Sequence, residues 1–569
     1  MYKSKFLKLS ILFLIVVLLA SLSLFGCKTT TAETTAAATT AAATTAAATT
    51  AVAETTAAEE LTLEEKERMD TIILGEAILT RFLDPMQLTD SRTRSILNSI
   101  YEGLTEYNPD DPADPLPCLA VDWQVNDDAT EWTFNLRKGV KFYPSGNEMT
   151  AEDVLYSLKR GIEENSPSYP PVVIKLLDPD TGIEIIDDYT VKITLKESFS
   201  DWPIICTLNH LSIVDKEELE KRISDEDPAG STYLNDHSVG TGPFYLEEWA
   251  REERIVLERN DDYWGISEGY HRAPKYKTFI SLNVPEPATQ EMMLLRGDID
   301  FTKDLPREIV AGIESEEGVK IVRNPIYVGT AIMMNPQFAP LSDPNVRMAI
   351  KHAIDYETIV NEIVSGMRQD RPYFTPMLGT DEDWIYSYDL DKAKELMAQS
   401  NYPDGFEVTH QIGTGIGLGA EWETLALQIQ SDLAKIGIIT TIEQYEWSIM
   451  DENIFGGNYE MLEAWWGPPY PTADGAMNRI GRGDTLAKLE VPIGYENDVI
   501  SSLADQALAE TDLGKRYELY RELAELYYED GPVCFVAQQI GEVSFREDIQ
   551  GWNNNPYFSE SDYAVIYRQ

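Results

Sequence analysis

Alternation of apolar and polar residues predicts a strand at 131–136. Trp132, Phe134 and Leu136 alternate there with polar neighbours, which is the period of a strand with one buried face. Strand character of this kind, or short apolar runs, recurs in the segments 71–77, 187–198, 240–265, 438–447 and 458–466. The 240–265 segment predicts two strands joined by a polar turn.

Helical patterns occur between these strands. Thr150 can cap a helix, with Asp153 three residues on in the pattern of a capping box. Apolar residues at helical spacing predict another helix at 346–353, and a helix before Gly437 is expected to end at that glycine. An exposed turn is predicted at 454–458. The mixed order of strands and helices indicates an α/β or α+β architecture.

The first 60 residues differ from the rest. Three lysines precede an apolar run at 9–25, which is the pattern of an export signal, with a permanent membrane helix as the alternative. The run ends in "LFGC", which resembles the bacterial lipobox and implies cleavage after residue 26 and a lipid on Cys27. Residues 27–60 are rich in Thr and Ala and are expected to form a flexible linker. The chain is thus expected outside the cytoplasm, on the membrane's outer face or in the periplasm.

Composition excludes several functions. The 569 residues carry a net charge of −51, so nucleic acid is a poor partner. Four cysteines without regular spacing and five scattered histidines argue against a disulfide framework and a metal site. Pairing among Cys118, Cys206 and Cys534 is left open, and no cofactor is implied.

Seven segments in order resemble the family 5 extracellular solute-binding proteins, the oligopeptide, dipeptide and nickel class that serves ABC importers. These segments are "DPMQLTDSRTRSILNSIYEGL", "LAVDWQVNDDATEWTFNLRKGVKF", "MTAEDVLYSLKR", "GTGPFYLEEW", "IVLERNDDYW", "LRGDID" and "PNVRMAIKHAID". The resemblance implies an α/β fold of the type II periplasmic-binding-protein kind, a two-lobed clamshell with an extra domain inserted in the first lobe. It places lobe I at 66–110, 237–325 and 536–569, the extra domain at 111–236 and lobe II at 326–535.

The resemblance also implies the function: capture of oligopeptides by hinge closure and delivery to an ABC permease and its ATPase, with no enzymatic step. In peptide binders of the family, one segment resembles Gly-Trp-x-x-Asp-Tyr, and its Asp pairs with the peptide's amino terminus. Trp466 and Tyr470 match here, but Pro469 stands in place of the Asp and offers no acceptor. Asp474 and Glu463 are the nearby acids that could substitute.

The candidate ligand-binding residues are therefore mostly aromatic or polar: Trp447, Trp465, Trp466, Tyr470, Thr89, Asp90, Ser91 and Tyr169. Each also has a structural interpretation, as a polar surface loop for 89–91, a Pro-rich connector for Tyr169 and a core residue for Trp465. Whether Trp465 faces the core or the cleft stays open, while Trp466 is expected to touch the ligand.

Three alternatives remain. Flat indole faces suit sugar rings, so an oligosaccharide is the main rival ligand. An extracellular hydrolase is disfavoured, because adjacent acids such as Asp127 and Asp128 do not supply the required spatial separation of two carboxylates, and the HExxH motif is missing from the sequence. A receptor-coupled sensor with the same fold cannot be told from a transporter by sequence.

Overall fold

The computed structural model describes residues 63–569 with gaps at 78–79, 81, 89–90, 165, 167, 365, 369–372, 375–376, 378–386, 415, 418–419, 469, 481–494, 554 and 558–561. Residues Leu61–Gln569 form one compact unit. The predicted export signal, Cys27 and the Thr/Ala-rich linker lie outside the described residues.

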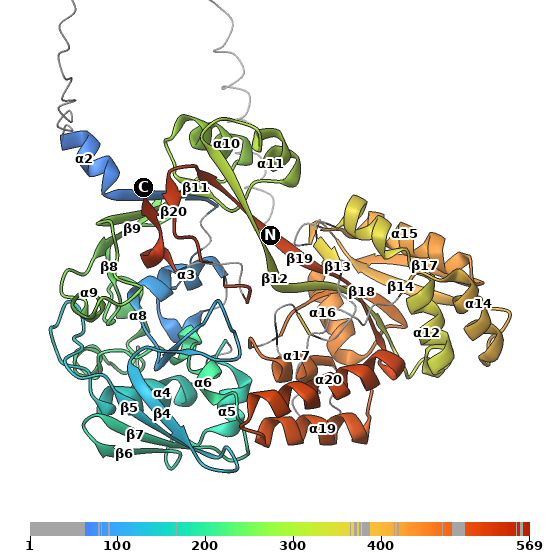
Figure 1. Ribbon diagram of the computed structural model, residues 1–569, viewed down its shortest axis with the longest axis horizontal. Helices are drawn as coiled ribbons and strands as arrows, with labels where there is room; N and C mark the ends of the chain where they lie inside the picture. The colour runs from blue at the N-terminus through green and yellow to red at the C-terminus, as the bar shows by residue number, and fades with distance from the viewer. Residues whose placement is uncertain are drawn as a thin grey trace, which may run out of the picture. The chain divides into compact units, whose positions relative to one another are not determined.

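A large mixed sheet dominates the described chain (Figure 1). Its strands, in spatial order, are β17 (Ile438–Tyr445), β14 (Phe406–Gly413), β18 (Met461–Trp466), β12 (Val319–Met334), β19 (Val533–Arg546), β11 (Phe301–Thr302), β1 (Thr71–Glu76), β10 (Thr278–Asn283), β9 (Arg254–Arg259) and β8 (Phe244–Ala250), with β13 (Gly366–Arg368) also on β19. The strands predicted near 71, 244, 254, 438 and 461 are all present.

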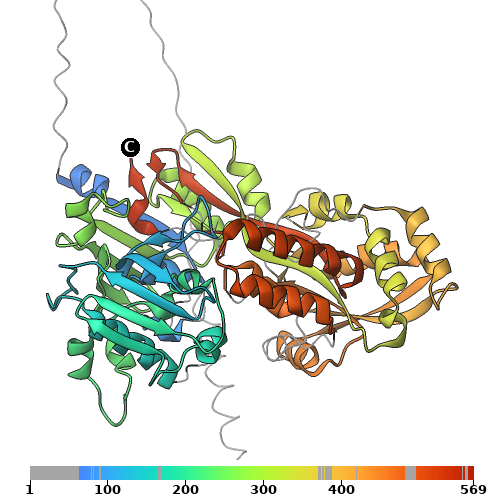
Figure 2. The ribbon, with the colours of Figure 1, turned by 60° about the horizontal axis from the view of Figure 1, so that its bottom comes forward.

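Two long antiparallel strands, β12 and β19, run through both parts of this sheet, as Figures 1 and 2 show. The first part of β12 pairs with the end of β19 that adjoins β11, and the second part lies between β18 and the start of β19. The register shifts between Pro325 and Gly329, where three residues of β12 lie opposite one residue of β19, and again after Thr330. Such bulges bend a strand and increase its twist, so the two parts of the sheet meet at this irregularity.

A separate four-stranded antiparallel sheet has the order β4 (Ala120–Val125), β5 (Glu131–Leu136), β7 (Thr190–Thr194), β6 (Ile183–Asp187). In β5 the alternation is confirmed: Trp132, Phe134 and Leu136 are buried. They pack in one hydrophobic cluster with α4 (Ala151–Glu163), α5 (Pro171–Leu176) and α6 (Trp202–Ile205). The predicted capping box of α4 is confirmed, because Thr150 N donates to Asp153 Oδ2 at 2.8 Å.

The predicted turn at 454–458 is wrong in its extent. A helix, α16 (Trp447–Gly456), occupies most of the connection from β17 to β18 and ends at Gly457, whose φ is 66°. Both strands pair in parallel with β14, and a parallel connection must cross over the sheet instead of turning back tightly. The strand prediction considered each segment alone and missed this requirement.

The remaining helices cover the sheets. They are α2 (Leu63–Met69), α3 (Ser91–Ile100), α7 (Lys216–Glu220), α8 (Ser231–Leu234), α9 (Trp264–Glu268), α10 (Pro287–Arg296), α11 (Arg307–Ile313), α12 (Pro344–Ala353), α13 (Tyr356–Thr358), α14 (Leu390–Gln399), α15 (Trp422–Ala434), α17 (Ala473–Ile480), α19 (Asp498–Ala509) and α20 (Leu513–Asp530). The mixed α/β class is confirmed. The division into lobes and an extra domain stays a prediction. Cys118, Cys206 and Cys534 are buried, and no disulfide joins any two of them.

Candidate functional site

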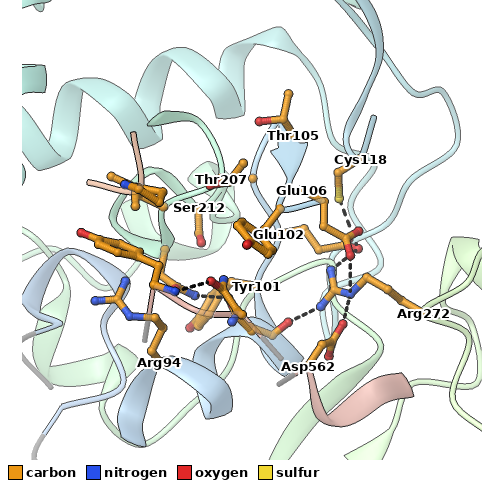
Figure 3. A pocket seen from close by; sticks show the side chains of 18 of the residues that line it. Arg94, Tyr101, Glu102, Thr105, Glu106, Cys118, Thr207, Ser212, Arg272 and Asp562 are labelled. Carbon is orange, nitrogen blue, oxygen red and sulfur yellow. Dashed lines mark hydrogen bonds and ion pairs between the residues drawn. The ribbon is translucent and has the colours of Figure 1, made fainter. Parts of the chain in front are cut away.

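A polar cavity lies where three distant parts of the chain meet. Its walls come from α3 and the segment after it, from residues 207–212 and from the C-terminal residues Asn553, Asn555, Tyr557 and Asp562, and Pro471 reaches it from the segment that follows β18 (Figure 3). The cavity encloses about 80 Å³. Side-chain amides of Asn98, Asn209 and Asn555 line it together with Arg94. Groups of this kind can hydrogen-bond to a polar ligand, particularly one rich in carbonyl and carboxylate oxygens.

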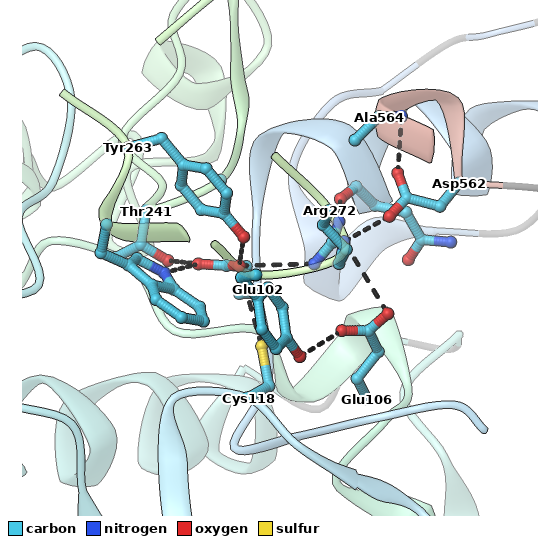
Figure 4. Close-up of polar contacts among 12 residues, drawn as sticks. Glu102, Glu106, Cys118, Thr241, Tyr263, Arg272, Asp562 and Ala564 are labelled. Carbon is cyan, nitrogen blue, oxygen red and sulfur yellow. Dashed lines mark hydrogen bonds and ion pairs between the residues drawn. The ribbon is translucent and has the colours of Figure 1, made fainter. Parts of the chain in front are cut away.

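Glu102, at one end of the cavity, is a buried carboxylate with many donors. It accepts from the Tyr263 hydroxyl at 2.8 Å, from Trp264 Nε1 at 2.9 Å and from the Thr241 hydroxyl at 2.7 Å (Figure 4). Burial raises the pKa of Glu102, although Arg272 and the three donors favour its charged form. The donors come from residues 241–272, so Glu102 fixes the end of α3 against that segment.

Arg272 ties this carboxylate to two others. Its guanidinium lies 3.4 Å from Glu102 and 3.9 Å from Glu106, and it also ion-pairs with Asp562 (Figures 3 and 4). Glu106 accepts from Tyr270 at 2.6 Å and His271 at 2.9 Å. Burial opposes ionisation of Glu106, but Arg272 and His271 outweigh it, and its pKa is lowered. The acids of the cavity are thus engaged by the protein's own groups, which makes this end a rigid floor.

The opposite side of the cavity carries Arg94, Tyr557 and two asparagine side chains. The Arg94 guanidinium carbon lies 5.7 Å from the centroid of the Tyr557 ring, within cation–π range. Asn209 donates to the Asn98 side chain at 2.7 Å. Figure 3 shows Arg94 and Arg272 on different sides of the cavity. This side of the cavity therefore presents amides, a guanidinium and an aromatic ring, opposite the Glu102–Arg272 floor.

The two adjacent tryptophans of β18 face opposite environments. Trp466 is 1% exposed and packs on Phe374 and Phe535, with ring centroids at 4.5 and 5.0 Å. Trp465 is 43% exposed. Every residue of β18 except Trp465 is buried, and of the two open placements for Trp465 the core is excluded. Contact of either indole with ligand stays a prediction, and neither lines the cavity.

The other aromatic candidates are packing residues in this conformation. Trp447 begins α16 and makes an edge contact with Trp422 at 5.6 Å. Tyr470 is 3% exposed, donates to Asp474 at 2.5 Å and contacts Phe199 edge-on. Tyr169 is buried beside His210. None of these three lines the cavity, although Pro471 directly follows Tyr470.

The polar candidates Thr89 and Asp90 lie outside the described residues, as does Pro469. Ser91 begins α3, and its side chain is likewise outside the description. Of the two acids that could replace the missing Asp, Asp474 bonds Tyr470, and Glu463 is fully buried 3.3 Å from His410. Burial holds the pKa of Glu463 well above its usual value, so it is poorly suited to pair with an ammonium group.

Sequence reasoning missed Asn98, Glu102, Asn209, Arg272 and Asp562. Glu102 stands in "IYEGL", one of the segments that carry the family resemblance, but nothing local separates it from a surface acid. Its donors Thr241, Tyr263 and Trp264 are more than 130 residues away along the chain. Across the described ranges, no helix is long and apolar enough to span a membrane, and no cluster of three His, Cys, Asp or Glu could hold a metal.

Comparisons with known proteins agree with this architecture. The family model described as bacterial extracellular solute-binding proteins, family 5 Middle, matches residues 114–486. The probable D,D-dipeptide-binding periplasmic protein DdpA of Escherichia coli K12 is 28% identical over 499 residues, which cover 86% of this chain and 93% of that protein.

Two solved structures share the fold. HbpA2 from Haemophilus parasuis superposes with a TM-score of 0.79 at 23% identity, over 88% of this chain and 100% of that one. The ABC transporter-associated periplasmic binding protein DppA from Helicobacter pylori, in complex with the peptide STSA, superposes with a TM-score of 0.69 at 25% identity, over 89% and 100%. The fold is thus the two-lobed α/β fold of periplasmic binding proteins. Because the family model covers more than half of the chain, this protein belongs to the family 5 bacterial extracellular solute-binding proteins.

Proposed function

We propose that the protein is an extracytoplasmic, lipid-anchored binding protein of an ABC importer that captures peptides and delivers them to a membrane permease. The observation that carries the proposal is the polar cavity, which is built from segments far apart in a chain of this family. The names of DdpA and of the DppA complex with STSA support a peptide as the ligand. Bond chemistry plays no part in this function.

The size of the cavity supports a cycle of opening and closing. About 80 Å³ has room for a few water molecules, whereas sites for drug-sized ligands span roughly 300–1,000 Å³. A peptide can therefore enter only if the walls separate first. The bulges of β12 near Pro325 and Gly329 lie where the two parts of the sheet join, which makes them the natural hinge.

The lobes proposed for this motion are 66–110 with 237–325 and 536–569, and 326–535, with 111–236 as the extra domain. The buried clusters support this division. One cluster surrounds β1, β9 and β10, two lie on either face of the β14–β18–β12 region, and another belongs mostly to residues 104–229. Each part thus has apolar residues enough for a core of its own.

Lipid anchoring through Cys27 is proposed from the "LFGC" segment alone. An acyl chain contributes about 0.8 kcal/mol per buried methylene, so two or more chains hold a protein stably on a membrane. The linker of residues 27–60 would then allow the folded binding unit to lie at a distance from the membrane surface. Metabolic labelling with palmitate in the wild type and in Cys27→Ser tests this part, and equal labelling of both would exclude it.

The oligosaccharide alternative loses much of its support. It rested on a Trp-rich site, but Trp466 is a core residue here and Trp447 packs on Trp422. Of Trp447, Trp465 and Trp466, only Trp465 is exposed.

Thermal denaturation with candidate ligands tests the proposal. A ligand present at 100 times its dissociation constant stabilises the folded state by about 2.7 kcal/mol. We expect mixtures of short peptides to raise the melting temperature and cello- and xylo-oligosaccharides to leave it unchanged. Stabilisation by sugars alone would reverse the choice of ligand, and stabilisation by neither would refute peptide capture.

A further inference from the structure

A buried ion pair outside the main cavity joins two parts of the molecule that the proposed function sets in motion. Asp201 stands directly before α6 and is 1% exposed, and Arg516 on α20 is 4% exposed. Their side chains pair across 315 positions of sequence, and Figure 1 shows α6 beside α19 and α20. In the division proposed above, Asp201 belongs to the extra domain and Arg516 to lobe II. Opening of the lobes would therefore separate them.

Hydrogen bonds and apolar contacts accompany this ion pair. Ser200 donates its backbone N–H to the Leu508 carbonyl at 2.8 Å and its hydroxyl to the Ala507 carbonyl at 3.4 Å. Phe199 meets the edge of Tyr470 at a centroid distance of 6.1 Å, and Tyr470 and Leu508 both pack in the apolar cluster that contains Phe199. Each of these contacts joins two groups of the protein itself. They therefore form in the closed state whatever the ligand is.

The contact lies next to the main cavity. Asp201 and Arg516 line a second cavity of about 10 Å³, and Pro471 lines this cavity and also the main one. Tyr470, the residue directly before Pro471, makes the contact with Phe199. Closing of the contact and enclosure of the main cavity are thus parts of the same movement.

The ion pair is suited to repeated release. Asp201 Oδ2 and Arg516 Nε are buried and make no hydrogen bond within the described chain. A buried ion pair gains little over its separated, hydrated charges, whereas loss of one partner leaves the other charge buried without a counter-ion. The pair therefore permits opening, but the closed state is sensitive to the loss of either partner.

We propose that residues 199–201, together with Tyr470, α19 and α20, form a latch that favours the closed state independently of the ligand's chemistry. The proposal rests on the proposed function, because it requires lobes that open and close. Asp201 and Arg516 are positioning residues in it and do not touch the ligand. The latch alone leaves the lobes free to open, and tighter binding of the ligand to the closed state completes the closure.

A latch of this kind has a defined effect on binding. It forms after the ligand has entered the open cleft, so it slows dissociation and leaves association unchanged. Because the ligand makes no contact with it, it strengthens the binding of every ligand by the same factor. A residue that touches the ligand would instead change the affinities of different ligands by different factors.

Variants of the ion pair isolate this effect. Asp201→Asn and Arg516→Gln each leave one charge that is hydrated in the open state and buried without its counter-ion in the closed state, so both should oppose closing. Asp201→Asn/Arg516→Gln buries no charge and should close nearly as the wild type does. Asp530→Asn is the matched control, since it removes the Arg347 ion pair at the other end of α20.

An apolar variant makes the test independent of the charges. Leu508→Ala removes part of the contact with the cluster around Phe199 and leaves the ion pair in place. It should oppose closing in the same direction as the single charge variants. It therefore keeps the latch open to refutation if Asp201→Asn or Arg516→Gln fails to fold.

Energy transfer between two dyes measures closing. The dyes would be attached at Ile186→Cys on β6 and Ile439→Cys on β17, which are 53% and 55% exposed in the wild type, in a Cys27→Ser background. Two mixtures of random tripeptides, one containing Lys and one containing Glu, would be titrated into the purified protein. We expect each single charge variant to raise the concentration for half-maximal closing at least about tenfold, by the same factor for both mixtures. Dissociation on dilution should accelerate by that factor too.

Three results would contradict this account. Half-closing concentrations that stay at the wild-type value in the single variants and in Leu508→Ala would overturn the latch and leave peptide capture standing. Weaker binding of only the Lys mixture by Asp201→Asn, and of only the Glu mixture by Arg516→Gln, would show that these residues touch the ligand and would also overturn it. Failure of the wild type to close with either mixture would refute the proposed function itself.

Discussion

Trp465 and Trp466 are neighbours in β18 whose side chains meet different surroundings. The strand period sends them to opposite faces, and the ring of Trp466 is enclosed by Phe374 and Phe535 whereas Trp465 is 43% exposed. The contribution of Trp466 to the free energy of unfolding should therefore be that of a core residue, whatever its role in binding.

We expect Trp466→Ala to lower the free energy of unfolding by about 3–5 kcal/mol, because removing a buried aromatic side chain leaves a cavity. Trp465→Ala, the matched change one position earlier, should lower it by less than about 1 kcal/mol. Urea denaturation of both variants checks this. Equal losses would show that Trp466 is not enclosed as described.

His410 and Glu463 form an isolated pair on neighbouring strands. Both are 0% exposed and lie 3.3 Å apart, and their nitrogens and carboxylate oxygens have no hydrogen bond. Burial raises the pKa of Glu463 well above 4.5 and lowers the pKa of His410 to about 3. Each group is therefore stabilised in its neutral form.

The sign of the pH dependence follows from Glu463. Above pH 4.5 the unfolded chain loses this proton while the folded protein keeps it, so stability falls as pH rises, by up to about 1.4 kcal/mol per pH unit. Glu463→Gln removes this slope. His410 acts in the opposite direction, because it makes the folded protein less stable as pH falls from 6.5 towards 3. Both the wild type and Glu463→Gln contain His410, so its contribution largely cancels in the difference between their stabilities.

We therefore expect the stability of Glu463→Gln relative to wild type to increase between pH 5 and pH 8 in urea titrations. Glu446→Gln, the same change at an exposed position, serves as the matched control. A constant difference for Glu463→Gln would mean that its carboxyl titrates normally.

Among the helices and strands, α15 ends shortly before Gly437, the glycine at which the sequence predicts its end. Gly437 follows the helix with φ of 85°, a conformation that L-residues adopt at a cost of roughly 1–2 kcal/mol. Gly312 lies inside α11, has no positive φ, and a Cβ there would meet nothing within 4 Å.

Opposite effects on stability are therefore expected from the same substitution. Gly437→Ala should destabilise by about 1–2 kcal/mol, and Gly312→Ala should stabilise by about 0.5–1 kcal/mol because glycine is a poor helix former. Thermal unfolding compares them directly. Stabilisation by both substitutions would contradict the left-handed conformation at 437.

Patterns among neighbouring residues predicted individual strands and helices well. They did not reveal features that arise from contacts between distant parts of the chain. The alternation of 131–136 and the Thr150–Asp153 box depend only on neighbours, and both are confirmed. Helix α16 was missed because its need arises from the parallel pairing of β17 and β18 with β14. The Glu102–Arg272 floor was missed because 170 positions separate the two residues.

At the scale of the whole molecule, β12 and β19 connect the two parts of the main sheet, with bulges where those parts meet. The polar cavity encloses about 80 Å³ and is lined by both early and late segments of the chain. A ligand can favour the closed state only by binding it more tightly than the open one. Capture of a peptide thus requires that closure be measurable and ligand-dependent.

The most direct test is a distance measurement between spin labels on the proposed extra domain and lobe II. Ile186→Cys on β6 and Ile439→Cys on β17 are 53% and 55% exposed in the wild type, and Cys118, Cys206 and Cys534 are buried, so a Cys27→Ser background leaves two accessible sites. We expect a broad distribution with long distances in the peptide-free protein, which a saturating tripeptide mixture narrows to one shorter distance. The same distribution with and without peptide would contradict capture by closure.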